Sequence, residues 1–178
     1  VLIKNGNQFG LTPYGTEAMH VLRAERGFII VGQETDGTVS PIDLGMDWII
    51  SKKKKDFIGK RSLERASMKQ NDRKELVGLL SDDPNTVIPE GAHAIDEKDL
   101  ELEEKNILGH VTSSYFSSNC KRSIAMALIK NGRARKGNKL VIPLLNGDKI
   151  KAKIVNPVFF DPNGCLLYTS PSPRDLLK

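Results

Sequence analysis

Residues 139–155, KLVIPLLNGDKIKAKIV, contain two short apolar segments on either side of Asn146-Gly147-Asp148. An Asn-Gly pair between two such segments favours a β-hairpin, because both residue types tolerate the positive φ angles of a tight turn. In the second segment, residues 150–155, Ile and Ala alternate with Lys, which places the apolar side chains on one face of a strand. We therefore predict two antiparallel strands here.

Similar short strands are expected upstream of this hairpin. The segments are KELVGLL (74–80), GHVTSSYF (109–116), RSIAMALI (122–129), KLVIPLL (139–145) and IKAKIVNPVFF (150–160), with an acidic loop after the first. Turn residues such as Gly, Pro and Asn separate them. This spacing is typical of a small antiparallel barrel or sandwich.

The first third of the chain has a different sequence pattern. Residues 16–26 predict a helix with an apolar stripe of Ala18, Met19, Val21 and Leu22. We expect strands at FIIVG (28–32) and LGMDWIISK (44–52), with Trp48 in the core, and a short helix beginning near Phe57 or Gly59. The polar residues 68–73, MKQNDR, predict a linker and a domain boundary. The fold class that follows is α+β.

Glu25 is the residue of this predicted helix that fits the helical pattern least well. It falls on the side of the apolar stripe, in the last turn before Gly27, where the helix dipole disfavours negative charge. An ion pair with Arg23, Arg26 or a lysine is the commoner explanation of such a carboxylate. The alternative is a ligand with two adjacent N–H donors, such as a pyrimidine-like edge, since a carboxylate offers only acceptors.

Composition excludes several classes of protein. The 178 residues carry a net charge of +5, but the basic residues are spread out except at Lys52–Lys55, so we expect no nucleic-acid binding. No apolar run is long enough to span a membrane, and Cys120 and Cys165 lack a CxxC spacing, which favours a reduced, cytoplasmic setting. The chain has no GxGxxG, HExxH or GxSxG motif, and its three histidines are scattered, so we predict neither a metal site nor a catalytic residue.

Four motifs in fixed order resemble the folate-binding aminomethyltransferase family, which has the fold of the glycine cleavage T-protein. They are YGTEAMHVLRAERGFIIVGQETDGTVSPIDLGMDWIISKKKKDFIGKRSL (14–63), DRKELVGLL (72–80), GHVTSSYFSSNCKRSIAMALI (109–129) and KAKIVNPVFFDPNG (151–164). Within the family, YGTEAMHVLRAE and GQETDGTVSP are most similar to the carboxy-terminal part of heterotetrameric sarcosine oxidase alpha subunits.

The resemblance implies three regions. Residues 1–67 would be an amino-terminally truncated part of the folate-binding aminomethyltransferase core, and residues 72–164 the carboxy-terminal β-barrel. We expect residues 165–178, CLLYTSPSPRDLLK, to be a non-native or disordered tail, because SPSP has the composition of a loop. The chain also begins without an initiator Met, so we expect it to be a fragment.

The resemblance also implies a site and a function. Glu25 would bind the pterin edge of tetrahydrofolate, and Lys54 would contact the folate as a point charge where T-proteins can have Arg. The parent would be a sarcosine oxidase, with flavin and NAD bound in other parts of the complex and other subunits as partners. The fragment alone would be inactive.

Two alternatives remain open. A glycine-cleavage-type aminomethyltransferase or a dimethylglycine dehydrogenase would use the same folate pocket with a different donor. A non-catalytic module for subunit assembly would belong to another class.

Overall fold

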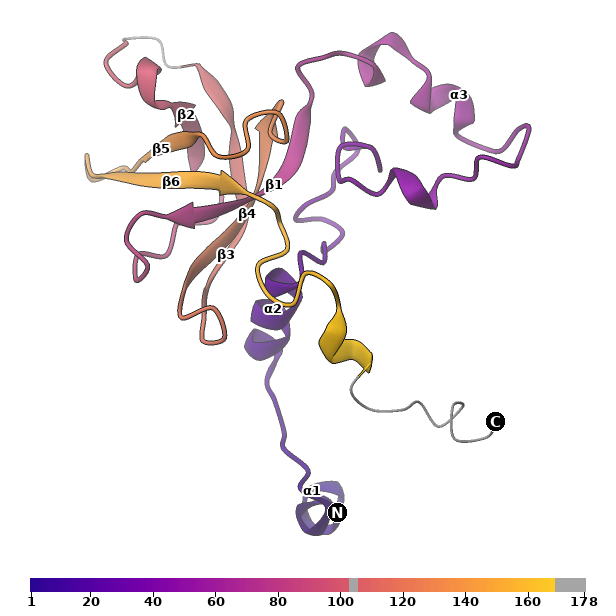
Figure 1. Cartoon of the computed structure of the whole chain (residues 1–178), viewed down its shortest axis with the longest axis vertical. Helices are drawn as coiled ribbons and strands as arrows, with labels where there is room; N and C mark the ends of the chain where they lie inside the picture. The colour runs from indigo at the N-terminus through magenta and orange to yellow at the C-terminus, as the bar shows by residue number, and fades with distance from the viewer. Residues whose placement is uncertain (103–105, 169–178) are drawn as a thin grey trace.

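Residues 74–155 contain the six strands of a closed antiparallel barrel (Figure 1). The computed structural model describes residues 1–102 and 106–168. Neighbouring strands follow the order β1-β4-β3-β2-β5-β6, and β6 pairs with β1 to close the barrel. The strands are β1 (Lys74–Ser81), β2 (His93–Asp96), β3 (Ile107–Ser117), β4 (Arg122–Lys130), β5 (Lys139–Pro143) and β6 (Lys149–Val155).

Alternation along the strands determines which side chains fill the barrel. In β6, Ile150, Ala152 and Ile154 are buried, whereas the lysines between them are exposed. Strand β4 differs, because Ser123–Ile129 are buried on both faces. One face fills the barrel, and the other packs Ile124, Met126 and Leu128 against Ala24 of helix α2 (Thr16–Glu25). The amino-terminal helix therefore shares a core with the outside of the barrel.

The hairpin at Asn146-Gly147-Asp148 is confirmed. The chain reverses between β5 and β6 with Gly147 at φ 88°, and the Leu144 N–H donates to the carbonyl of Asp148 over 2.8 Å.

One strand was missed, because β2 lies where we predicted an acidic loop. Only Ala94 and Ile95 in it are apolar, too short a pattern to recognise.

The strand predicted for residues 150–160 ends earlier than expected. Strand β6 stops at Val155, before Pro157, whose nitrogen has no hydrogen to donate to a ladder. The following residues leave the barrel and approach the end of α2. Residues Cys165–Tyr168 form a 3₁₀ turn, and the rest of the predicted tail, 169–178, lies outside the described residues.

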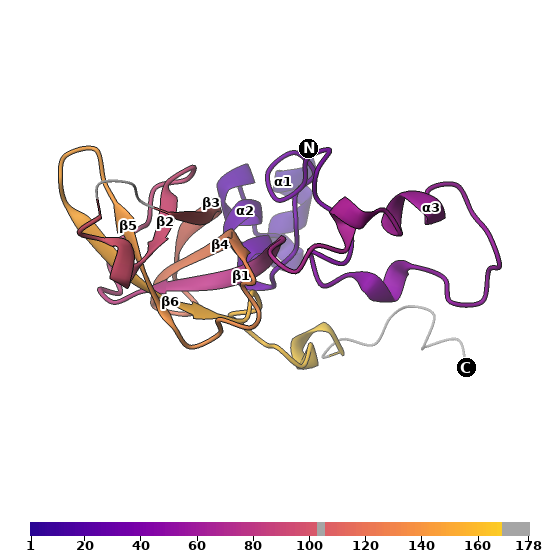
Figure 2. The same cartoon turned by 90° about the horizontal axis from the view of Figure 1, so that it is seen from above.

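The amino-terminal third contains helices and turns instead of the predicted strands. Besides α2, the α-helices are α1 (Leu2–Gly6) and α3 (Lys60–Leu63), and short 3₁₀ turns occur at Asn7–Phe9, Asp47–Ile49 and Ala66–Met68. The helix predicted at residues 16–26 and the short helix predicted to begin near Phe57 or Gly59 are therefore confirmed, and the second begins at Lys60. Residues around α3 project from the barrel beside β1 (Figure 1, Figure 2).

Both strand predictions in this third were wrong. Residues 28–32 contribute only an isolated bridge between Val31 and Thr35, and Trp48 lies in a 3₁₀ turn with 74 % of the residue exposed. The stripe on α2 is also less buried than expected, with Met19 and Leu22 nearly half exposed. Short apolar runs indicate burial somewhere, but they do not specify a strand when no partner strand is present.

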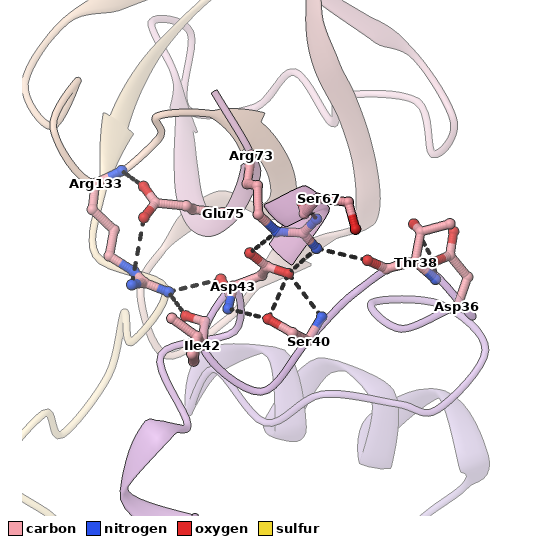
Figure 3. Close-up of polar contacts among 9 residues, drawn as sticks. All are labelled: Asp36, Thr38, Ser40, Ile42, Asp43, Ser67, Arg73, Glu75 and Arg133. Atoms are coloured by element: carbon pink, nitrogen blue, oxygen red, sulfur yellow. Dashed lines mark hydrogen bonds and ion pairs between the residues drawn. The ribbon is translucent and has the colours of Figure 1, made fainter. Parts of the chain in front are cut away.

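A polar network joins this third to the start of the barrel (Figure 3). Asp43 is buried and accepts hydrogen bonds from the Ser40 N–H over 2.7 Å and the Ser40 hydroxyl over 2.8 Å. Its other donors come from Arg73, which also donates to the carbonyl oxygens of Thr38 and Ser67. The residues predicted to be a simple linker thus deliver Arg73 to a structural ion pair.

A second arginine approaches the same segment from the barrel. Arg133 donates to the carbonyl oxygens of Ile42 and Asp43 and pairs with Glu75 at 3.5 Å.

In the part of the chain that the structure describes, no helix has the length and apolar character needed to cross a membrane.

Candidate functional site

Helix α2 ends where the sequence pattern predicted. Gly27 adopts a left-handed conformation with φ 68°, and its N–H donates to the carbonyl of Ala24 over 3.0 Å. The Phe28 N–H donates to the carbonyl of Arg23 over 2.9 Å, which satisfies a further carbonyl of the last turn. Because the chain turns sharply here, Glu25 is held against the barrel.

The Glu25 carboxylate is almost completely buried, with 2 % of the residue exposed. The hydroxyl of Ser117 donates to Oε1 over 2.6 Å, and the amide of Asn119 donates to Oε2 over 2.8 Å. We call Glu25, Ser117 and Asn119 the Glu25 site. Ser117 ends β3, and Asn119 lies in the turn to β4, so the barrel supplies both donors.

The ion pair that we considered for Glu25 is not formed among the described residues. Arg23 pairs with Glu34 at 3.0 Å, and Arg26 pairs with Asp161 at 2.9 Å. Among the described residues, the side-chain partners of Glu25 are neutral donors, and no cation forms an ion pair with its carboxylate. A buried carboxylate of this kind favours further N–H donors over an acceptor.

The backbone at Glu25 is fixed as firmly as the side chain. Its carbonyl oxygen accepts from the Phe159 N–H over 2.9 Å and from the Phe160 N–H over 3.0 Å. The Arg26–Asp161 pair lies beside these bonds. Two segments of the barrel half, the β3–β4 turn and residues 157–161, therefore hold the end of α2 between them.

Replacing Gly27 by Ala should measurably loosen this junction. A Cβ atom here would lie 2.7 Å from the carbonyl oxygen of Pro157, and φ is 68°. We expect Gly27→Ala to reduce the free energy of unfolding by about 2–3 kcal/mol, combining backbone strain with a displaced segment. Urea denaturation measures the loss.

Gly91→Ala is the matched control, because Gly91 has a similar φ of 76° but no atom within 4 Å of the added Cβ. It should cost only the strain, about 1–2 kcal/mol. Equal losses for the two variants would show that the contact with Pro157 contributes nothing.

A second buried carboxylate, which our sequence analysis missed, contacts the same strand, β3. Glu34 is fully buried and accepts from Arg23 Nη1 over 3.0 Å, from the Ile30 N–H over 2.8 Å and from the hydroxyl of Ser113. Glu34 lies in the polar stretch after residues 28–32, and periodicity offers no signal for it. Ser113 and Ser117 of β3 thus each hold one carboxylate of the amino-terminal segment.

Lys54 lies elsewhere in the described structure. It is exposed, and its backbone N–H donates to the hydroxyl oxygen of Ser51 over 3.3 Å. It borders a hollow of about 500 Å³ whose lining includes Ile49, Phe57 and Ile58 but not Glu25. No hydrogen bond or ion pair between described residues joins Lys54 to Glu25, so the structure does not bring the two predicted residues together.

A larger hollow, of about 630 Å³, lies on the barrel itself. It is bordered by residues 89–93 and 143–146 and includes neither Glu25 nor Lys54. The hollow offers few polar groups to a ligand, because its lining is mostly apolar and Glu90 already accepts a hydrogen bond from the Ser114 N–H over 3.2 Å. The Glu25 site therefore remains the better candidate.

Comparison with known families agrees with this architecture. The sequence model of the glycine cleavage T-protein C-terminal barrel domain matches residues 74–161, and that of the GCVT N-terminal domain matches residues 1–54. The chain belongs to the glycine cleavage T-protein family. The predicted fold, part of an aminomethyltransferase core followed by an antiparallel barrel, is confirmed.

Two individual proteins are similar to most of this chain. The sarcosine oxidase subunit alpha of Corynebacterium sp. (strain P-1) is 50 % identical over 160 residues, which cover 89 % of this chain but 16 % of that protein. The aminomethyltransferase of Thermoanaerobacter pseudethanolicus is 30 % identical over 165 residues, covering 91 % of this chain and 41 % of that protein.

A solved structure is also similar. The crystal structure of glycine cleavage system aminomethyltransferase T from Bartonella henselae has a TM-score of 0.69 and 25 % identity, covering 82 % of this chain and 38 % of that one. The chain thus spans less than half the length of each of these three proteins.

Proposed function

We propose that this chain is the folate-binding carboxy-terminal part of a sarcosine oxidase alpha subunit. In this role it positions tetrahydrofolate to accept the one-carbon unit released when sarcosine is oxidatively demethylated to glycine. The relative at 50 % identity supports the assignment to this branch of the family. The observation that carries the site is the buried Glu25 carboxylate, whose hydrogen-bond partners in the described part of the chain are the neutral donors Ser117 and Asn119.

The chemistry of Glu25 suits the pterin edge of a folate. That edge presents a ring N–H beside an amino group, and a carboxylate can accept from both at once. Ser117 and Asn119 use two of the roughly four acceptor positions of the carboxylate. Further N–H donors would be favoured on this carboxylate, because the described structure places no cation beside this charge.

Lys54 would act on a different part of the ligand. Its ammonium group belongs to the exposed run Lys52–Lys55, which favours anions such as the carboxylates of a folate tail. A lysine is a mobile point charge rather than a planar fork, so we expect attraction without fixed geometry.

This chain contributes binding and orientation rather than proton transfer. Holding an acceptor in place next to a reactive carbon, away from water, accelerates the transfer through proximity. Flavin and NAD would belong to other parts of the parent complex, together with its other subunits. We therefore expect no oxidase activity from the 178 residues alone.

Calorimetric titration of the parent complex with folinate, a stable reduced folate, tests this proposal. We expect saturable binding with one folate for each copy of this chain. Absence of binding would favour the assembly-module alternative, in which Glu25 is only an internal hydrogen-bond acceptor. The aminomethyltransferase relatives keep a second candidate open, and consumption of sarcosine with release of hydrogen peroxide would exclude it.

A further inference from the structure

The two donors at the Glu25 site differ in how firmly they are held. Ser117 is fully buried at the end of β3, and its hydroxyl oxygen accepts from the Cys120 N–H over 2.9 Å. The single hydroxyl proton is therefore directed to Oε1 of Glu25, 2.6 Å away. Ser117 is fixed by both its burial and its second hydrogen bond.

Asn119 is held much less firmly than Ser117. It is exposed, lies in the turn between β3 and β4, and makes one side-chain hydrogen bond among the described residues, to Oε2 of Glu25 over 2.8 Å. Rotation of an exposed side chain to another rotamer is fast and costs little beyond the bond that is lost. Asn119 is thus the part of the site that can move without disturbing the fold.

Asn119 is the exposed partner of the buried Glu25 carboxylate. The carboxylate cannot accept from a ligand while the residue is only 2 % exposed. The backbone of Glu25 is held by the N–H groups of Phe159 and Phe160. Ser117 is buried, so Asn119 is the partner of Glu25 that can move most easily. The amide of Asn119 is an N–H donor on Oε2, as the amino group of a pterin edge would be.

We propose that Asn119 is a displaceable cover on Glu25, whose amide occupies the position that a ligand N–H takes, and that Ser117 is the positioning residue that keeps the carboxylate oriented throughout. The proposal rests on the proposed function of Glu25 as the pterin-binding residue. A cover of this kind lowers the apparent affinity by the fraction of molecules in which the carboxylate is open.

The test is that the two donors should have opposite effects on folinate binding by the parent complex. Asn119→Ala removes the competing donor, so the dissociation constant should fall by roughly 5-fold. Ser117→Ala removes the anchor, so the dissociation constant should rise by roughly 10-fold. In the Glu25→Gln background, Asn119→Ala should give no gain, which an unrelated structural effect would not reproduce.

Asn146→Ala is the matched control. Asn146 is also an exposed turn residue whose amide donates to a nearby carboxylate, that of Asp148 at 2.6 Å, but it lies in the β5–β6 turn. It should leave the dissociation constant unchanged. Thermal melting of each variant checks that Ser117→Ala still folds, and Asn119→Ala keeps the test decisive if it does not.

The outcomes distinguish the proposed cover, Asn119, from the proposed folate site at Glu25. If the wild type binds folinate and Asn119→Ala binds equally or more weakly, the cover is refuted while the folate site stands. If the wild type does not bind folinate, both proposals are overturned.

Discussion

Glu25→Gln is expected to weaken binding of folinate to the parent complex by about 100-fold, or roughly 3 kcal/mol. The substitution conserves size but replaces one carboxylate oxygen with an NH₂ group. That group would face the hydroxyl of Ser117, the amide of Asn119 or an N–H of the ligand, all of which are donors. At least one donor would lose its acceptor in a buried place.

Calorimetry on the wild type and the variant measures this loss directly. Glu17→Gln is the matched control, because Glu17 lies on the same helix but in its exposed first turn. It should bind folinate as the wild type does. If Glu25→Gln also keeps its affinity, Glu25 does not belong to the folate site and serves only to fasten α2 to the barrel.

The barrel could be predicted from sequence because its signals are local. Lysines alternate with apolar residues along β6, and Asn146-Gly147 specifies the turn before it. Both patterns depend on residues within a few positions of each other. The closing pair β1–β6 and the short strand β2 carry no such signal, because their pairing is decided by the rest of the barrel.

The Glu25 site was predictable only in part. A carboxylate in the last turn of an amphipathic helix contradicts two local rules, so Glu25 could be singled out. Its partners could not, because Ser117 and Asn119 lie 92 and 94 residues away along the chain. Glu34 was missed for a related reason, since its burial depends on Ser113 of β3, 79 residues distant.

Asp43→Ala is expected to lower the free energy of unfolding at neutral pH by about 3–4 kcal/mol. Asp43 is 4 % exposed, and its removal leaves the largely buried guanidinium of Arg73 without its carboxylate (Figure 3). The Ser40 N–H and hydroxyl lose their acceptor at the same time. The cost is large because charged and polar groups stay buried after their partner has gone.

The same network predicts how this loss depends on pH. Burial tends to raise the pKa of Asp43, but hydrogen bonds from Arg73 and Ser40 outweigh it and hold the pKa below the ordinary value of 3.8. A carboxylate with a depressed pKa in the folded state contributes its full stability above the unfolded value. The contribution is lost as the pH falls from 3.8 through the lower folded pKa.

Urea denaturation of the wild type and Asp43→Ala across this pH range tests both statements. The difference in stability should be constant near neutral pH and should shrink once the pH falls below 3.8. Asp83→Ala is the control, because hydrogen bonds from Thr86 and Asn85 also lower the pKa of Asp83, but in an exposed turn. It should cost far less at every pH. A difference for Asp43→Ala that stays constant or widens in acid would mean that the ionised carboxylate is not what joins the amino-terminal segment to the barrel.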